Sequence, residues 1–534
     1  MKKIFYLFIV LVSVYRLQAT EYYVAKNGND KNNGTINKPF KTINKASKKM
    51  KAGDVCFIRE GVYHEIVNLK SINGSVSMPY VFKAYKNEHV VLDGSIDLNL
   101  TWKKHQGNIY KAKLKTSIWQ LFVNDISMTS ARWPNGNWND GSVWDKKKSM
   151  AWPEKNKGSY GHHFNKELAS IKGDLTGAII IVNSGSFKTF KSNVIDHIPG
   201  TDNFKYDTKR KHIKVHFSFK GKTHRHGYFL EGKLALLDEE NEWFFNPKSK
   251  EIYLWAPEGK HPKNFRIKGK TQSYAFDIAN SSYIKLEGLN FFGTTFKADD
   301  SNYITVEDCN FMYPSYSKRM LGDLTLTDVS SMQARKKQTK THNTIRNCKF
   351  EYMDGPVLDM NGWNNVVENN YMHNIDYSCT YKGGYTLNMS QATQLLFRRN
   401  TVHTTGASEM YKAGVRNTIE LNDLSRSGHL QNDGSLVQVS VTSQDKSKTR
   451  FNWVHNSVKQ GLRFDNKNTP NAPWGENGNM HHNVAWKTDR VYFKGDKHFI
   501  YNNLSFDSHL NDLIISSNAA IQGHNHTTVT RNNI

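Results

Sequence analysis

Apolar and polar residues alternate in short runs along most of this chain, with a period of two. Residues 306–311 (VEDCNF) and 345–350 (IRNCKF) show this pattern twice, each with a cysteine two residues before a phenylalanine. Alternation with a period of two is typical of β-strands that bury one face, whereas a helix repeats every 3.6 residues. The pattern therefore predicts an all-β protein built from short strands.

The same pattern recurs through the second half of the chain, with asparagine in the place of cysteine. The residues that we align as one column are Leu289, Cys309, Cys348, Asn370, Asn400, Asn422, Asn456, Asn483, Asn503 and Asn533. Their spacing never falls below about 20 residues and is otherwise variable, which indicates stacked coils with insertions in the turns. Stacked asparagine amides satisfy one another when buried, and Cys309 and Cys348 are expected to fill the column as small apolar residues.

The N-terminal region divides into two parts. Residues 1–19 place Lys2 and Lys3 before an apolar run, the order of a secretory signal peptide, so we expect a secreted, periplasmic or cell-surface protein. Residues 20–94 should form the first coils and a cap, because Pro39 precedes an amphipathic helix. The apolar side of this helix contains Phe40, Ile43, Ala46 and Met50.

The rest of the chain also falls into two parts. Residues 95–271 lack the column and are rich in aromatic strands, with 246–249 as a hairpin turn, which predicts an inserted β-domain. Residues 272–534 carry the repeat. The last copy stops at Ile534 without a capping element, so we expect either a chain truncated at its C-terminus or an end that is closed by other means.

Two sets of motifs resemble a known group of proteins. The asparagine column, the variable coils and the opening YYVAKNGNDKNNGTINKPFKTINKASKKMKAGDVCFIREGVYHE resemble secreted polysaccharide lyases and glycoside hydrolases with a right-handed parallel β-helix. The stretches WQLFVNDISMTSARWPNGNW and EWFFNPKSKEIYLWAPEG are similar to a subset of β-helix glycoside hydrolases, which includes families acting on fucose-containing and sulfated glycans. The resemblance implies this fold and a carbohydrate-active enzyme.

The charge of the chain narrows the choice of substrate. Its formal net charge of +25 favours polyanionic partners. Export argues against nucleic acid, and no later segment is apolar enough to span a membrane. We therefore expect an acidic polysaccharide as the partner, and no membrane contact after signal cleavage. The four cysteines are too few for a disulfide framework. The oligomeric state is left open.

Acidic residues follow the column at similar distances in several coils. Asp359, Glu409, Asp433 and Asp465 lie 9 or 11 residues after their aligned residue. Acids at equivalent positions of adjacent coils, such as Asp433 and Asp465, would stand about 4.8 Å apart, near the separation of paired carboxylates in a retaining glycosidase. Skipping one coil, as from Glu409 to Asp465, gives about twice that distance, nearer the separation in an inverting glycosidase. Capping of a turn is the structural alternative for each of them.

The candidate site follows from this alignment. We predict Asp433, Asp465, Glu409 and His429 as catalytic residues. The predicted substrate-binding residues are His403, Lys412, Gln438, Arg463, Asp359, Trp138 and Trp144. The two tryptophans lie among glycine, asparagine and aspartate, so we expect them to be exposed and to stack on sugars, with the core of the inserted domain as the alternative.

Three functions fit these observations. The first is an endo-acting glycoside hydrolase on an acidic, sulfated polysaccharide such as a fucan or galactan, which requires no cofactor. The second is a polysaccharide lyase, with Lys412 or His429 as the base, Arg463 facing a uronate carboxylate and the acids holding Ca²⁺. The third is a non-catalytic glycan-binding protein.

Overall fold

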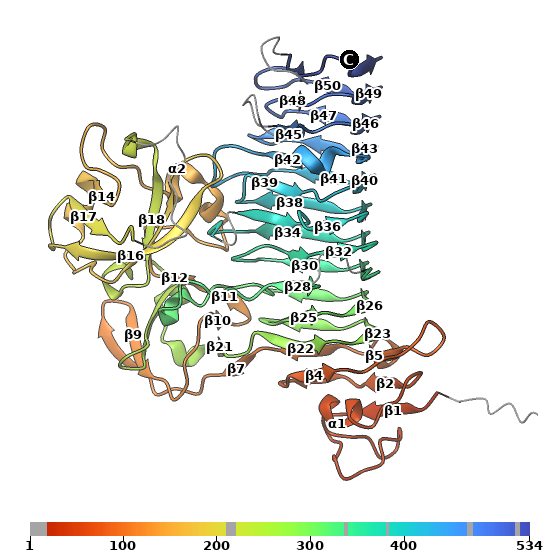
Figure 1. Cartoon of the computed structure of the whole chain (residues 1–534). Coiled ribbons are helices and arrows are strands. Elements are labelled where there is room, and N and C mark those ends of the chain that lie inside the picture. The colour runs from red at the N-terminus through yellow and green to blue at the C-terminus, as the bar shows by residue number, and fades with distance from the viewer. Residues whose placement is uncertain (1–18, 210–220, 336–339, 381–383, 467–473, 518–523) are drawn as a thin grey trace, which may run out of the picture.

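The computed structural model describes residues 19–209, 221–335, 340–380, 384–466, 474–517 and 524–534. The leader predicted for residues 1–19 lies outside these ranges, apart from Ala19. The main body is a column of stacked coils, and most coils contribute one strand to each of three parallel sheets (Figure 1). The predicted all-β parallel solenoid is confirmed.

Three parallel sheets run the length of the column. In spatial order, sheet 1 contains β1 (Glu21–Val24), β2 (Val55–Ile58), β5 (Tyr80–Ala84), β23 (Ser282–Glu287), β26 (Asn302–Glu307), β29 (Thr344–Arg346), β33 (Val366–Glu368), β37 (Leu396–Arg398), β40 (Thr418–Glu420), β43 (Lys448–Arg450), β46 (Asn479–His481), β49 (Phe499–Tyr501) and β52 (Val529–Arg531). Sheet 2 contains β3 (Gly61–Tyr63), β6 (Val90–Asp93), β24 (Asn290–Phe292), β27 (Asn310–Met312), β30 (Lys349–Glu351), β34 (Tyr371–Ile375), β38 (Thr401–Thr405), β41 (Asp423–Ser425), β44 (Trp453–His455), β47 (Val484–Trp486) and β50 (Leu504–Phe506). Sheet 3 contains β4 (Val67–Lys70), β22 (Tyr274–Ala279), β25 (Thr295–Asp299), β28 (Ser330–Gln333), β31 (Leu358–Met360), β35 (Tyr385–Asn388), β39 (Glu409–Lys412), β42 (Ser435–Ser440), β45 (Gln460–Asp465), β48 (Val491–Phe493) and β51 (Leu513–Ile515).

The chain leaves the column after β6 and returns at β22, and the intervening segment forms mostly antiparallel sheets beside the column (Figure 1). One sheet contains β11 (Ile126–Ser127), β10 (Leu121–Val123), β21 (Ile267–Lys270) and β7 (Ser95–Asp97). The others contain β12 (Thr129–Ser130), β19 (Glu242–Asn246), β20 (Glu251–Trp255), β9 (Ile109–Lys113) and β8 (Lys103–Gln106), and β13 (Arg132–Trp133), β18 (Gly227–Glu231), β15 (Ile179–Asn183), β16 (Thr189–His197), β17 (Asn203–Tyr206) and β14 (His162–Phe164). β19 and β20 pair antiparallel around the turn after Asn246, as the sequence predicts.

Asparagines at the turn from sheet 1 to sheet 2 form one continuous ladder. Asn400, for example, donates two hydrogen bonds to Oδ1 of Asn422, one from its backbone N at 3.0 Å and one from its side-chain Nδ2 at 3.1 Å. The same Nδ2 also donates to Val367 O. Every polar group of the side chain is therefore satisfied inside the column, which lets a buried amide stabilise the stack. The ladder runs through Asn370, Asn400, Asn422, Asn452, Asn483, Asn503 and Asn533.

One predicted member of the column is wrong. Asn452, and not Asn456, accepts the hydrogen bonds of Asn422, and Asn456 is exposed. Phe451, the residue before Asn452, has a left-handed φ of 57°, as Leu421 before Asn422 (58°) and His482 before Asn483 (55°) do. The segment WVHNSV, which begins with a tryptophan, resembles the repeat, so the sequence alignment placed Asn456 in the column instead of Asn452, an error of four residues.

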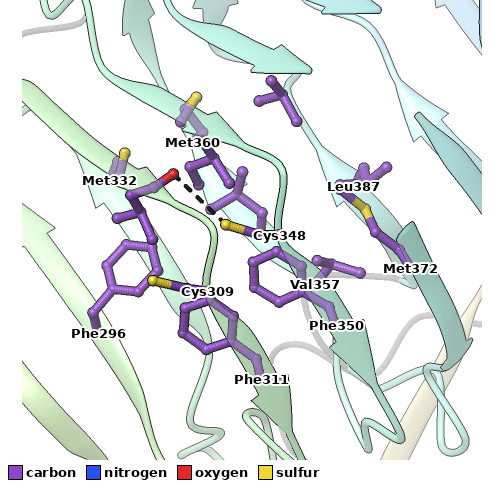
Figure 2. Close-up of a cluster of buried hydrophobic side chains, with 14 of the residues drawn as sticks. Phe296, Cys309, Phe311, Met332, Cys348, Phe350, Val357, Met360, Met372 and Leu387 are labelled. Atoms are coloured by element: carbon purple, nitrogen blue, oxygen red, sulfur yellow. Dashed lines mark hydrogen bonds between the residues drawn. The ribbon is translucent and has the colours of Figure 1, made fainter. Parts of the chain in front are cut away.

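Cysteine replaces asparagine in two coils near the start of the ladder. Cys309 and Cys348 are buried among the phenylalanines, methionines and aliphatic residues that fill the column (Figure 2). Phe311 and Phe350 stack on each other with ring centroids 4.5 Å apart. The expectation that both cysteines are small buried residues of the column is confirmed.

A short helix lies at the N-terminal end of the column (Figure 1). α1 spans only Ile43–Ser47, and Thr42 caps it by accepting from Lys45 N. The expected apolar side is buried, because Phe40, Ile43, Ala46 and Met50 all belong to the core. No helix among the described residues is long and apolar enough to cross a membrane.

Buried ionic contacts fix the inserted domain to the column. Arg319, between β27 and β28, pairs with Glu231 of β18 and with Asp354, and all three are almost fully buried. Tyr377 OH donates to Glu231 Oε2 at 2.8 Å. Because a buried charge that loses its partner is costly, this network holds the domain against the turns between sheets 2 and 3.

Candidate active site

A row of polar side chains follows one register position across sheet 3. Its members, one from each of six adjacent strands, are Asp359, Asn388, Lys412, Gln438, Arg463 and Tyr492. Their flanking positions in the strands fill the core, as Tyr411, Val437, Leu462 and Phe464 do. Since neighbouring strands lie about 4.8 Å apart, the row places its functional groups within reach of one another.

Arg463 is the centre of an ionic cluster on this row. Its Nη1 lies 3.1 Å from Asp433 Oδ1, and its Nη2 lies 2.8 Å from Asp465 Oδ1. Asp465 also accepts from Gln438 Nε2 at 2.9 Å and lies 3.3 Å from Lys494 Nζ. The structure therefore brings together Asp433, Asp465, Gln438 and Arg463, as the sequence predicts.

Glu409 opens strand β39 next to this cluster. Its Oε2 lies 3.0 Å from Lys412 Nζ, which also donates to Ser440 Oγ at 3.0 Å. Only 4% of Glu409 is exposed. Burial raises the pKa of Glu409 above its ordinary value, and Lys412 and Arg463 offset only part of this shift.

Asp433 is positioned by the turn that precedes β42. Gln431 Nε2 donates to Thr189 Oγ1, and Asn432 Nδ2 donates to Asn183 Oδ1, both in the inserted domain. Gly434 has a φ of +116°, and a Cβ there would lie 2.3 Å from Ser408 O, so only glycine fits. The polar residues at 431–433 thus tie this turn to the inserted domain and present Asp433 to Arg463.

The environment of Asp433 acts opposite to that of Glu409. Burial would raise the pKa of Asp433, but Arg463, the Gly434 N–H and Lys459 together hold it below its ordinary value. The pKa values of Glu409 and Asp433 are therefore shifted in opposite directions. Such a pair can supply one protonated acid and one ionised base or nucleophile.

The expected equivalence of Asp433 and Asp465 is wrong. Asp465 pairs in register with Ser440 at the end of β42, whereas Asp433 lies before that strand begins. The error follows from the alignment on Asn456, because Asp465 lies 13 residues after Asn452, the true ladder residue. The two acids meet because Arg463 reaches both.

Two predicted residues lie away from the cluster. His403 belongs to β38 of sheet 2, where its ring stacks on His373 at 5.2 Å and its Nε2 contacts Tyr371 OH. Asp359 shares the outward row but lies two strands before Lys412, where it accepts from Asn388 Nδ2 at 3.3 Å. The alignment of the coils did not reveal on which sheet each residue would lie, or at which position along the axis of the column.

The expectation of exposed tryptophans at 138 and 144 is wrong. Trp138 is 4% exposed and packs on Tyr377 of the column, with ring centroids 4.7 Å apart. Trp144 is 7% exposed and packs against it in the same apolar cluster. Their burial anchors the inserted domain, so the alternative of a core role describes them.

A cleft of about 910 Å³ lies beside Asp433, between the inserted domain and the column. We call it the basic cleft. It is lined by Gly141, Trp144, Asp145, Lys146, Lys147, Trp152, Arg426, Gly428, His429, Gln431, Asn432, Val458 and Lys459. His429 therefore faces the cleft and not the acids, and burial lowers its pKa to about 4.

Sequence reasoning missed the basic residues of this cleft. Lys146 and Asn432 are 286 positions apart, yet Lys146 Nζ donates to Asn432 Oδ1 at 2.6 Å. Lys459 Nζ donates to the backbone O of the same asparagine at 2.6 Å. The cleft forms where the inserted domain docks on the column. No local sequence pattern could therefore predict that these residues lie together.

The cluster does not fit a calcium ion. Glu409, Asp433 and Asp465 are each paired with a lysine or arginine, whereas Ca²⁺ requires six to eight oxygen ligands. Across the part of the chain that the structure describes, no three His, Cys, Asp or Glu side chains gather to hold a metal ion.

Comparisons with known proteins support this architecture. Residues 22–188 match the model of the Pel9A-like, right handed beta helix region. A glycoside hydrolase of known structure superposes with a TM-score of 0.60 at 14% identity, over 96% of each chain. The fold is a right-handed parallel β-helix. At that identity the likeness concerns the fold alone.

Two curated relatives match shorter segments. The uncharacterized protein YwoF of Bacillus subtilis (strain 168) is 39% identical over 108 residues, which cover 20% of this chain and 23% of YwoF. The pectate lyase PEL9 of Emericella nidulans is 36% identical over 77 residues, which cover 14% of this chain and 19% of PEL9. The matches thus span about a fifth of each relative.

Proposed function

We propose that this protein is a glycoside hydrolase that acts at the cluster around Arg463. The observation that carries the proposal is the opposite pKa shift of two carboxyl groups, Glu409, which is buried beside Lys412, and Asp433, which is paired with Arg463. Glycoside hydrolysis needs this combination of one protonated and one ionised carboxyl group.

The roles follow from these protonation states. Glu409, whose raised pKa favours the protonated form, would donate its proton to the glycosidic oxygen as the bond between that oxygen and C1 breaks. Ionised Asp433, 37% of whose side chain is exposed, either attacks C1 or takes the proton of the attacking water. Asp465 holds Arg463 in place, and Arg463 keeps Asp433 ionised.

The substrate that we propose is an acidic polysaccharide, such as a sulfated fucan or galactan, cleaved within the chain by an exported enzyme. A net charge of +25 raises the local concentration of polyanions.

A lyase is the second candidate, and the basic cleft favours it. Burial and the nearby Lys146 lower the pKa of Lys459 to about 8, near the value that a general base for β-elimination needs at neutral pH. Lys459 suits this role better than Lys412, which is paired with Glu409, or His429, whose pKa of about 4 makes it a weak base. The similarity to PEL9 also points toward a lyase.

Product analysis separates these functions. The purified protein would be incubated with sulfated fucans, sulfated galactans and polygalacturonate, and polymer length, reducing ends and ultraviolet absorbance would be followed together. New reducing ends without absorbance support the hydrolase, and an absorbing unsaturated uronate supports the lyase. Tight binding with unchanged polymer length would instead support a non-catalytic glycan-binding protein.

A further inference from the structure

The lining of the basic cleft carries an excess of positive charge. Its lining includes four cationic side chains, Lys146, Lys147, Arg426 and Lys459, against the single carboxylate of Asp145. Asp145 is already engaged, because it accepts from Lys147 N and lies 3.9 Å from Lys148 Nζ.

Two of these cations are held by the fold itself. Lys459 is 6% exposed, and its stem crosses Gly428, where a Cβ would lie 2.1 Å from the lysine chain. Both Lys459 and Lys146 donate to Asn432, one to its backbone oxygen and the other to its side-chain oxygen. Among the described residues, the hydrogen-bond partner of both ammonium groups is the uncharged Asn432, and Asp433 and Asp489 attract Lys459 only at longer range.

Lys459 is buried and Lys146 is half-buried, and placing two neighbouring ammonium groups there without a directly paired carboxylate is costly. The lowered pKa of each lysine, about 8, reflects this cost, since burial is its main cause. A bound anion would remove it.

The cleft also offers a surface for a sugar ring. Trp152 is 39% exposed, and Lys146 Nζ lies 5.2 Å from the centre of its ring. An exposed tryptophan face beside cations suits a pyranose that carries a charged substituent. Asn432, which binds both lysines, immediately precedes Asp433, so this ring would occupy a position next to the cleaved bond.

We propose that the basic cleft is a subsite for one anionic group, a sulfate ester or a carboxylate, on the sugar adjacent to the cleaved bond. Lys459, Lys146 and Arg426 would bind the oxyanion and Trp152 would stack on the ring. The inference rests on the proposed function for its position relative to the cleaved bond, but the charge selectivity belongs to the cleft itself.

The test measures binding to protein that carries Glu409→Gln, which prevents hydrolysis during the titration. The probes are sulfated fucan oligosaccharides and oligogalacturonides, each with a neutral counterpart made by desulfation or by carboxyl reduction. Lys146→Met and Lys459→Met should each weaken binding of a charged probe about tenfold or more and leave its neutral counterpart within twofold. Lys459→Arg should restore much of the affinity, which separates loss of charge from loss of packing.

Lys148→Met is the matched control. Lys148 follows Lys147 in the same short helix, is largely exposed and does not line the cleft, so its removal changes the net charge equally. It should leave all affinities unchanged.

Each outcome has a defined meaning. A preference for the sulfated or for the uronate probe supports the proposal and identifies the anion. Equal binding of charged and neutral probes, equal losses for both, or the same loss in Lys148→Met would overturn it. Failure of the hydrolase proposal appears separately, as unsaturated products or no cleavage by the wild-type protein.

Discussion

Arg463 reaches back one coil to Asp433, with Nη1 at 3.1 Å from the carboxylate oxygen, although the two residues are 30 positions apart. The contact joins a strand of sheet 3 to the turn that docks on the inserted domain. Arg463 is itself nearly buried, so solvent screens this attraction weakly. The pKa of Asp433 therefore depends on a residue from the next coil.

Replacement of Arg463 should shift the acid limb of the pH profile. Arg463 lowers the pKa of Asp433, so in Arg463→Met burial should raise that pKa and activity should fall at a higher pH than in the wild type. We also expect kcat/KM at the optimum to fall at least tenfold, which corresponds to about 1.4 kcal/mol. Arg463→Lys, which keeps the charge, should shift the limb less. If the acid limb of Arg463→Met lies at the same pH as that of the wild type, Arg463 does not control the pKa of Asp433.

Glu409→Gln should remove the alkaline limb. The proposed acid must be protonated, so wild-type activity should decline as pH rises through the raised pKa of Glu409. Glutamine does not titrate, and kcat should fall about 10²-fold or more. Glu420→Gln is the control, because Glu420 pairs with Arg450 on sheet 1 and lies outside the cluster. An alkaline limb that persists in Glu409→Gln would assign it to another group.

Removal of divalent cations should not reduce activity. The three acids of the cluster already pair with Arg463, Lys412 and Lys494, so they offer no open oxygen cage for Ca²⁺. After dialysis against EDTA, both activity and melting temperature should remain unchanged, and added Ca²⁺ should not raise the melting temperature. Loss of activity that Ca²⁺ restores would contradict this reading of the cluster.

The sequence was sufficient to predict the solenoid because its cause is local and repeated. Alternation every two residues and an amide in each coil are visible in single segments, and both appear in the sheets and the ladder. The sequence was less able to predict which residue of a single coil belongs to the ladder. WVHNSV resembles the other copies, but only the neighbouring coils decide that Asn452 is the ladder residue.

The candidate site was predictable only as far as coil register reaches. Asp433, Gln438, Arg463 and Asp465 come from adjacent coils and lie together. The basic cleft and the burial of Trp138 depend on the docking of the inserted domain, which joins residues nearly 300 positions apart. No local pattern encodes such a contact, so both features became apparent only in three dimensions.

Asp376 should make stability depend on pH. It is fully buried, and burial, with a smaller contribution from Asp354, raises its pKa well above the ordinary value. A raised folded-state pKa gives stability that is fully present below the unfolded value, near pH 3.9, and is lost as pH rises through the folded pKa. Asp376→Asn lacks this dependence, so its melting temperature should increase relative to wild type as pH rises above about 4. Exposed Asp507→Asn is the control. A difference that is constant with pH would contradict the assignment.

A pair of isosteric substitutions tests the ladder. Asn452 accepts from Asn422 N and Nδ2 and donates from its own Nδ2 to Asn483 Oδ1 and Ile419 O, all inside the column. Asn452→Asp removes these donors and buries a carboxyl group, so we expect a loss of about 2 kcal/mol or more in the free energy of unfolding. Asn456→Asp places the same group on the surface, at a left-handed position that aspartate tolerates, and should change stability by no more than about 0.5 kcal/mol. Urea unfolding at pH 7 measures both, and equal effects of the two substitutions would mean that the ladder does not pass through Asn452.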